Sequence, residues 1–567
     1  MRGATDGGDG GNVIVWADDT TYFAGAITTR GGVNGGDGGL VETSGAINLG
    51  VATTASVDAL APSGAAGDWL LDPTSVNVAT GGLTTGSDPD ILTRLADPAN
   101  VEVLTIDPSV LNNATANVSI VASDTITFTD AVAMTGAGVG LTAEAGTSIT
   151  VNAALTTSNG DITFISDDYD INAAVNAGTG TLLFDRVTAG LLDVGLAPGT
   201  SSGGAGLDTA ELALLTAGDL IFGNPTAAQN QVHILSLRQF ANNPNISGLV
   251  QFNALDSAGS YIIVSSDQTY PSVEYNANDG VTFTADATIA TTVGDATFNV
   301  DADGTGVVSG FDSLEVYDGF TAVVNSAADI LVIAPDIREH GTGTISLNAN
   351  GGAGTITIQR SSAGTIGVGD GNGRFLQFSD AQLARLTAGT INFGNPTTPN
   401  NTTAINVNAV DLSGIANVIF NTAGTTTFTG AGSFGSLAVN GGPIAVNGTI
   451  NATGTIDLTA NSPITFAANL IAGGNITATA VDDGAADTDN ITVNAGVTVQ
   501  STGGDVTLQA GDDVFMGIGA TISANGTLDL TAGFGDTDGD GGITMAATAS
   551  LAGNQSTSPQ STTSRWA

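Results

Sequence analysis

The sequence contains no cysteine, no lysine and only two histidines. Without cysteine, neither disulfides nor thiol chemistry can stabilise this protein or serve it. Without lysine, none of its glycine-rich segments can form a nucleotide-binding phosphate loop, which requires a Gly-Lys-Ser/Thr ending. Runs of about 18 apolar residues are also absent, and residues 1–6 hold no apolar segment, so we expect neither a membrane span nor a signal peptide in this chain.

Positive charge is scarce, because 10 basic residues stand against 55 acidic ones and the formal net charge is -45. Such a surface repels the phosphate backbone of nucleic acids and anionic lipid, so nucleic acid is excluded as a partner. Calcium, which prefers carboxylate and carbonyl oxygens, remains a candidate ligand, although we expect no required cofactor. We favour the alternative that the charge keeps a glycine-rich repeat protein soluble outside the cell.

Aromatic residues are few, at 5% of the chain, whereas hydrophobic residues reach 41% and the mean hydropathy is +0.23. This hydrophobic content can form a large core, which argues against general disorder. The dominance of Gly, Ala, Ser, Thr and Asn argues against a globular α/β domain with a bulky core. We therefore expect a narrow, layered core.

Helical periodicity is nearly absent, and short runs that alternate an apolar with a small polar residue recur instead. Four of these runs have the form Gly-x-(Ile/Val/Leu)-x-(Leu/Ala)-x-Ala and begin at Gly454, Gly474, Gly504 and Gly526. The spacing between them is similar except for one longer interval, which an acidic insertion over Asp482–Asp489 accounts for. The pattern predicts an all-β solenoid with coils of about 20–22 residues.

A longer repeat is superimposed on the short one. Residues 180–195 match residues 354–369 at an offset of 174, and residues 215–226 match residues 386–397 at an offset of 171. The match indicates duplication of a block of about eight coils. Helix-capping residues predict only a few short helical excursions, at residues 90–96, 208–215 and 380–386.

These patterns divide the chain into six segments. We expect the start of the solenoid at 1–75, coils with one short helix at 76–175, repeat block 1 at 176–350, a partial repeat block 2 at 351–440, regular coils at 441–553, and a disordered tail at 554–567.

The most specific signal lies near the N-terminus, in residues 11–73. Its landmarks follow in the order Trp16–Asp18 (WAD), Arg30–Gly32 (RGG), Gly35–Gly45 (GGDGGLVETSG) and Leu70–Pro73 (LLDP). This series resembles the stretch that follows the secretion domain in filamentous-haemagglutinin-like two-partner-secretion exoproteins, which are large bacterial adhesins. The repeated LTAG and FGNPT segments extend the likeness thinly over most of the chain.

The resemblance implies a right-handed parallel β-helix that is exported through a separate outer-membrane two-partner-secretion transporter. It implies a location outside a Gram-negative bacterium or on its outer surface, and a role in attachment or aggregation through a host-cell, glycan or other surface receptor. Members of this family begin with a signal peptide and a secretion domain. Because this chain shows neither, we expect it to be a passenger fragment.

One acidic segment has the spacing of a calcium loop. Asp536, Asp538 and Asp540 alternate, and a glycine occupies the sixth position as in calcium loops, but the bidentate Glu at the twelfth position is missing. Ordinary Asp-Gly turns explain the same pattern. We name these three residues as the candidate metal ligands and expect the other acidic runs, Asp482–Asp489 and Asp512–Asp513, to form solvated corners.

Catalytic residues are not evident, and we expect no enzyme. A β-helix enzyme acting on polysaccharide needs Arg or Lys beside carboxylates on one face of adjacent coils. The densest polar cluster, Asp336–His340, precedes a Gly-Thr-Gly turn and is interpreted as a solvated loop. Trp16, Tyr22 and Phe23 are interpreted as core or cap residues of the first coils.

The leading functional hypothesis is therefore a secreted or cell-surface adhesin that presents loops on a β-helix. Two alternatives are kept: an extracellular β-helix enzyme that degrades polysaccharide, and a calcium-stabilised structural protein of the cell surface. Release of product from glycans favours the first alternative, and a melting shift caused by chelator favours the second.

Overall fold

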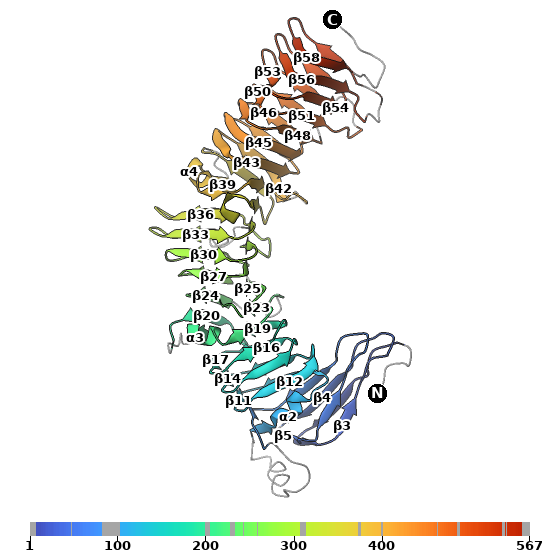
Figure 1. The fold of residues 1–567 in the computed structure, drawn as a ribbon, viewed down its shortest axis with the longest axis vertical. Coiled ribbons are helices and arrows are strands. Elements are labelled where there is room, and N and C mark those ends of the chain that lie inside the picture. Colours follow the sequence, from blue (N-terminus) through green and yellow to red (C-terminus); the bar gives the residue numbers. More distant parts are fainter. Residues whose placement is uncertain are drawn as a thin grey trace. The chain divides into compact units, whose positions relative to one another are not determined.

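The alternating runs of the sequence form strands, and the strands of successive coils pair side by side in register (Figure 1). The four copies of the sequence motif become β48 (Ile456–Ala460), β51 (Ile476–Ala480), β54 (Val506–Ala510) and part of β56 (Thr521–Ala532). Ile476 pairs with Ile456 on one side and with Val506 on the other, and both pairings are parallel. The chain is thus a parallel β-helix, as predicted.

The protein is described from a computed structural model. The structure describes residues 7–46, 48–81, 103–198, 205–226, 233–241, 243–257, 259–306, 313–371, 376–397, 401–461, 463–484, 488–535, 539 and 541–557.

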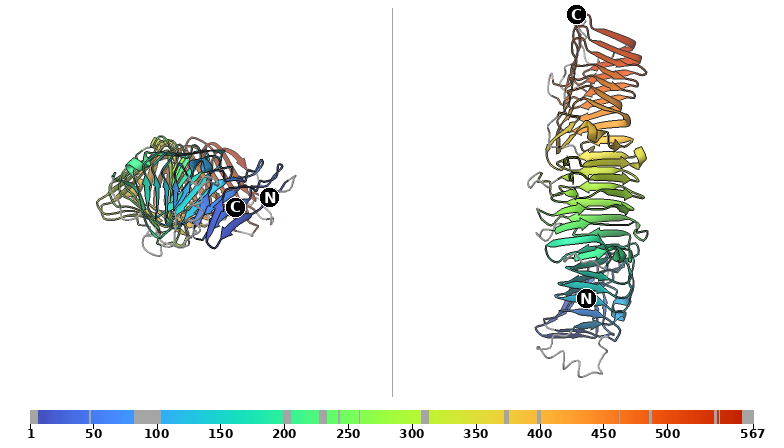
Figure 2. Two further views of the ribbon diagram at one scale, coloured as in Figure 1. Left: turned by 90° about the horizontal axis from the view of Figure 1, so that it is seen from below. Right: turned by 90° about the vertical axis from the view of Figure 1, so that its left-hand side faces the viewer.

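Each regular coil has three short strands separated by corners. In the C-terminal coils, the second row of strands is β49 (Ile464–Phe466), β52 (Ile491–Val493) and β55 (Val514–Met516), and the third row is β47 (Ile450–Ala452), β50 (Leu470–Ala472) and β53 (Thr498–Ser501). Because successive side chains of a strand point to opposite faces, every second residue is buried, as in the pattern of β54, where Val506, Leu508 and Ala510 are buried. Figure 2 shows the strands lying one above another within each part of the chain.

The chain divides into two compact units, residues 1–278 and 279–567. Regular coils of the predicted length occur in both units, as the pairings of Ile162 with Leu182 and of Ile456 with Ile476 show. Other coils are longer because loops and short helices leave the coil between strands. In the first unit, for example, the strand partner of Trp69 is Val118, and a much longer stretch of chain lies between them.

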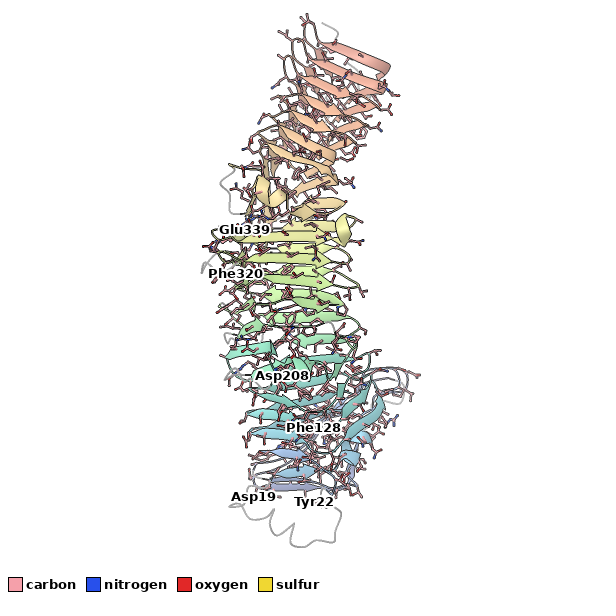
Figure 3. All side chains as sticks on the ribbon, turned by 60° about the vertical axis from the view of Figure 1, so that its left-hand side comes forward. Asp19, Tyr22, Phe128, Asp208, Phe320 and Glu339 are labelled. Carbon is pink, nitrogen blue, oxygen red and sulfur yellow. The ribbon has the colours of Figure 1, made fainter. Side chains whose placement is uncertain are left out.

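Aromatic side chains form a ladder along the core of the first unit. Phe222, on β23 (Asp219–Phe222), stacks on Phe184 with ring centroids 5.8 Å apart and on Phe252 with centroids 5.3 Å apart. Tyr275 continues the ladder 5.4 Å from Phe252. Phe128, labelled in Figure 3, is likewise fully buried. In-register coils place identical positions above one another, so the aromatic residues of this ladder stack in the interior of the first unit.

Short helices are few in the described residues. The helix expected at 208–215 is α3 (Thr209–Leu212), capped by Asp208 as predicted, and the helix expected at 380–386 is α4 (Asp380–Leu383). The N-cap of α4 is Ser379 and not Asp380, because the Ser379 hydroxyl accepts from the N–H of Gln382. A further short helix, α2 (Pro108–Asn112), was not predicted, and the helix expected at 90–96 lies outside the described residues.

The regular coils run slightly further than predicted. β58 (Ser550–Thr557) pairs with β56 through Thr557, so the start of the predicted tail belongs to a strand. Within the described part of the chain, no helix is both long and apolar enough to cross a membrane.

Candidate functional site

The predicted calcium ligands Asp536, Asp538 and Asp540 lie outside the described residues. Two of the acidic residues expected at solvated corners are not solvated: Asp489 is 0% exposed and Asp512 is 1% exposed. That expectation was wrong because it considered each acidic run alone, whereas the stacking of coils buries one run against another.

The aromatic residues near the N-terminus differ from one another in exposure. Phe23, on β2 (Thr20–Phe23), is buried and meets the buried Trp69 edge-on, with ring centroids 6.0 Å apart. Tyr22 is half-buried, but Trp16 is 55% exposed, so Trp16 is not a core residue. Trp16 lies on β1 (Val13–Ala17), which pairs with β4 (Leu40–Gly45) and is an edge strand among the described residues.

The polar cluster Asp336–His340 is a strand and not a solvated loop. Ile337–Glu339 form β35, which pairs with β32 (Leu314–Val316) and brings Arg338 within 3.5 Å of Glu315. Arg338 also pairs with Asp336 at 2.9 Å, and Glu339 pairs with Arg385 of a following coil (Glu339 is labelled in Figure 3).

His340 contributes less to this network. Its Nε2 atom lies 3.4 Å from the buried Glu315, but 48% of its side chain is exposed.

Asp336 is substantially buried, and burial raises the pKa of its carboxyl while Arg338 opposes the rise. The cluster is therefore an ion-pair network between coils, which does not point to catalysis.

A polar cavity in the second unit brings together residues that are far apart in the sequence. Its volume is about 420 Å³, and it lies at a corner where four successive coils turn. Those corners follow β31 (Ala296–Asn299), β34 (Ile330–Ile333), β37 (Thr355–Gln359) and β41 (Thr390–Phe393). Its polar lining includes Asp301, Asp303, Arg360, Ser361, Asn395 and Asn401.

Asp301 is the buried acid of this cavity, only 2% exposed. The hydroxyl of Ser361 donates to its carboxylate at 2.5 Å, and the N–H of Gly306 lies 3.2 and 3.3 Å from its two oxygens. Burial raises the pKa of the Asp301 carboxyl to about 6; neighbouring Asp303 adds to the rise, although the bonds from Ser361 and Gly306 oppose it. Such a carboxyl exchanges a proton near neutral pH.

Arg360 is the positively charged residue of this cavity and is also buried, at 6% exposed. Its Nε donates to the carbonyl of Ser362 at 3.0 Å, and its NH1 donates to the carbonyl of Pro335 at 3.0 Å. Burial lowers the pKa of the guanidinium, while Asp336 and Asp301 oppose this effect. Because two of its donors bind backbone carbonyls, Arg360 holds the corner together. Its positive charge also interacts with Asp301.

The internal repeat gives this arginine a counterpart. Arg186 occupies the matching position in the first unit, where its Nε donates to Thr188 at 3.1 Å and its NH1 to Leu191 at 2.6 Å. Its acidic neighbour is Asp167, 3.3 Å away. The arginine clamp therefore belongs to the repeated block, whereas the pairing of Asp301 with Ser361 occurs at the second copy.

The arrangement can bind a polar ligand. A buried carboxyl, a guanidinium and polar side chains that line the cavity present groups that suit hydroxyl-rich or carboxylate-bearing molecules such as sugars. This site could not be predicted, because Asp301 and Ser361 are far apart in the sequence and meet only through coil stacking. The repeated arginine was the one signal in the sequence.

Comparison with known proteins does not assign a family. No protein-family model matches the chain, and no curated protein is similar to it at a significant level.

Proposed function

We propose that this protein is a secreted or cell-surface adhesin, a β-helical passenger that attaches cells or aggregates them through its loops. The observation that carries the proposal is the parallel ladder itself, in which the motif strands bury every second side chain and leave polar positions outside. The haemagglutinin-like series from Trp16 to Pro73 supports the same role.

The physical reasoning starts from what a solenoid can do. Each coil contacts only its neighbours, so the loops of successive coils lie next to one another and together form a surface that can bind a partner. Thr, Asn and Ser dominate the polar positions, and hydroxyl and amide groups bind neutral glycans through hydrogen bonds. The strong negative charge suppresses non-specific contact with other anionic surfaces.

The decisive experiment measures binding and turnover together. The purified chain is incubated with cells and with a glycan panel, and both retention and product release are measured. An adhesin is retained on one class of surface in a saturable way and releases no product. Absence of binding to every surface, or release of sugar product, would contradict the proposal.

We also propose that the protein reaches the outer surface of a Gram-negative bacterium through a separately encoded two-partner-secretion transporter. The test fuses the chain behind a family secretion domain and expresses it with and without the matching transporter. The proposal expects the chain on the cell surface only in the presence of the transporter. Retention in the periplasm in both cases would contradict it.

One observation favours a second candidate function, an extracellular enzyme acting on polysaccharide. Asp301 and Arg360 from different coils meet in one cavity, and the pKa of Asp301 is raised to about 6. A carboxyl near neutrality beside a cation is suited to general acid-base chemistry on sugars. If product release is found, Asp301→Asn abolishes it while leaving the circular-dichroism spectrum unchanged. Release that persists in this variant would exclude the cavity as the active site.

A further inference from the structure

One corner of the second unit carries an enlarged loop rich in aspartate. The coil from Ile476 to Val506 is clearly longer than the coil before it, which runs from Ile456 to Ile476. The extra residues follow β51, so Asp482 and Asp489 lie at the same corner as Asp512, which follows β54 in the next coil. Two stacked coils thus contribute acids to one place.

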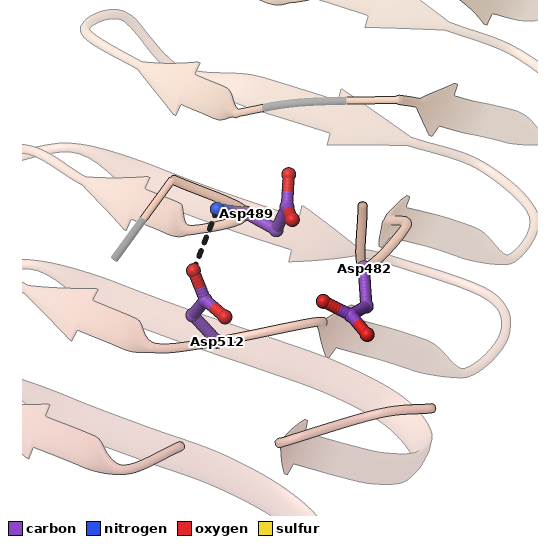
Figure 4. Close-up of side chains that lie close together, drawn as sticks. All are labelled: Asp482, Asp489 and Asp512. Atoms are coloured by element: carbon purple, nitrogen blue, oxygen red, sulfur yellow. Dashed lines mark hydrogen bonds between the residues drawn. The ribbon is translucent and has the colours of Figure 1, made fainter. Parts of the chain in front are cut away.

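The three carboxylates converge. One carboxylate oxygen from each of Asp482, Asp489 and Asp512 lies within 4.8 Å of the other two. Figure 4 shows the side chains facing one space, with the Asp512 oxygen that is not bonded to Asp489 turned toward Asp482.

Backbone hydrogen bonds hold these side chains in place. The N–H of Asp489 donates to Asp512 at 2.8 Å, the N–H of Asp483 donates to Asp489 at 2.8 Å, and the N–H of Gly484 donates to Asp482 at 2.9 Å. The site therefore has a defined geometry and is not a set of freely moving surface acids.

Two of the carboxylates have a buried oxygen without a partner. The Oδ1 atoms of Asp489 and Asp512 are buried and accept no hydrogen bond, and the two residues are 0% and 1% exposed. A buried carboxylate oxygen is unfavourable unless a donor or a cation compensates it. Three like charges within one small space add mutual repulsion, which a divalent cation removes.

Close backbone approach makes this convergence possible. A Cβ atom at Gly511 would lie 2.7 Å from the Cα of Asp482, closer than real side chains allow. Glycine at 511 therefore lets the enlarged loop pack directly against the residue that precedes Asp512.

We propose that Asp482, Asp489 and Asp512 bind one calcium ion that links two successive coils of the second unit. Calcium binds carboxylate oxygens at about 2.3–2.6 Å, so oxygens on opposite sides of the ion are separated by roughly the span seen here. Its flexible coordination allows water and carbonyl oxygens to complete the shell. The ion stabilises the corner by compensating the buried oxygens from both coils.

The test compares the whole chain with two single variants. Asp512→Asn removes one ligand charge at the site, and Asp457→Asn removes one charge at an exposed position on β48 as a matched control. Calcium binding is measured by calorimetry after chelator treatment, at about 0.15 M salt to screen exposed charges and with magnesium present as competitor. Thermal unfolding is followed with calcium and with chelator.

The proposal expects one saturable calcium site in the wild type and in Asp457→Asn, with a thermal midpoint several degrees higher in calcium than in chelator. Asp512→Asn loses that site and that shift. In chelator it melts no lower than the wild type, because removing one of three like charges relieves repulsion. This last result separates lost binding from a damaged fold.

Two results would overturn the proposal. The first is a wild type that shows neither saturable calcium binding nor a melting shift. The second is a calcium shift of equal size in all three proteins, which assigns the effect to other acids, including Asp536, Asp538 and Asp540. If Asp512→Asn does not fold, Asp482→Asn replaces it, because Asp482 is only half-buried, and the same two outcomes apply.

Discussion

Asp301 shows how the stacking of coils changes the chemistry of a single residue. The carboxyl is buried, and burial raises its pKa to about 6, well above about 3.9 for an exposed aspartate. A raised pKa means that the protonated form fits the fold better than the charged form. The stability that this form contributes is complete below about pH 4 and is lost as the pH rises through about 6.

The prediction is therefore a pH-dependent difference between the wild type and Asp301→Asn. Between about pH 4 and pH 7, the unfolding free energy of the wild type falls relative to that of the variant, whose amide does not titrate. Denaturant titrations at several pH values measure it. The exposed control Asp457→Asn follows the wild type over the same range. Parallel pH profiles for wild type and Asp301→Asn would contradict the prediction, because they would show that the pKa of Asp301 is the same in the folded and unfolded chain.

Gly364 is the residue that makes room for the arginine clamp. A Cβ atom there would lie 2.5 Å from the central carbon of the Arg360 guanidinium, which is held by two backbone carbonyls. We expect Gly364→Ala to destabilise the second unit by about 1–3 kcal/mol through overpacking. Denaturant unfolding measures the loss.

The control for this prediction is Gly414→Ala. A Cβ atom at Gly414 meets no other atom within 4 Å, so this substitution changes stability little or raises it slightly. Equal losses in both variants would mean that a general backbone effect, and not the arginine contact, causes the loss.

At the residue scale, the sequence showed individual residues of the two sites but not which residues they contact. The match between Arg186 and Arg360 was visible as part of the long repeat, and the acidic insertion before Asp489 was visible as an enlarged coil. Neither showed which residues they would face, because a one-residue change in coil register moves every contact between coils. Asp301 and Ser361 meet across a long stretch of sequence for this reason.

At the scale of elements, strand patterns were far more informative than sites. The Gly-x-Ile-type motif predicted both the strands β48, β51 and β54 and their pairing, because identical alternation places identical positions above one another. Coil lengths were less predictable where helices intervene. α2 was missed although its cap, Asp107, and the proline after it are a helix-start signal, because a helix of five residues is too short to show helical periodicity.

The aromatic ladder gives a test at this scale. Phe222 is fully buried between Phe184 and Phe252, so Phe222→Ala leaves a cavity inside the coil and removes two ring contacts. We expect a loss of about 3–5 kcal/mol in the stability of the first unit, seen as faster hydrogen exchange in the strands next to β23.

The matched control lies outside any ladder. Val293 is 73% exposed, so Val293→Ala leaves stability within about 0.5 kcal/mol. If Phe222→Ala were as mild as this control, neither the burial of the ring nor its stacking would contribute to the stability of the first unit.

At the scale of the whole molecule, composition was the most reliable guide. The scarcity of bulky residues predicted a thin core, and the described strands indeed bury Val, Ile, Leu and Ala along each unit, with aromatics stacked within it. The division after Asn278 was not foreseen, because it falls inside the predicted block 176–350 and no change in composition marks it.

The net charge of -45 leads to the last prediction. Acidic residues crowded on a folded chain repel one another more than on an expanded chain, and salt screens this repulsion over about 10 Å at 0.1 M. In the presence of chelator, the thermal midpoint therefore rises as sodium chloride increases. Tetramethylammonium chloride, whose cation coordinates carboxylates poorly, raises it to a similar extent if screening is the cause. A rise with sodium alone would instead indicate cation binding at defined carboxylates, and a fall with both salts would show that surface repulsion does not limit the stability of this fold.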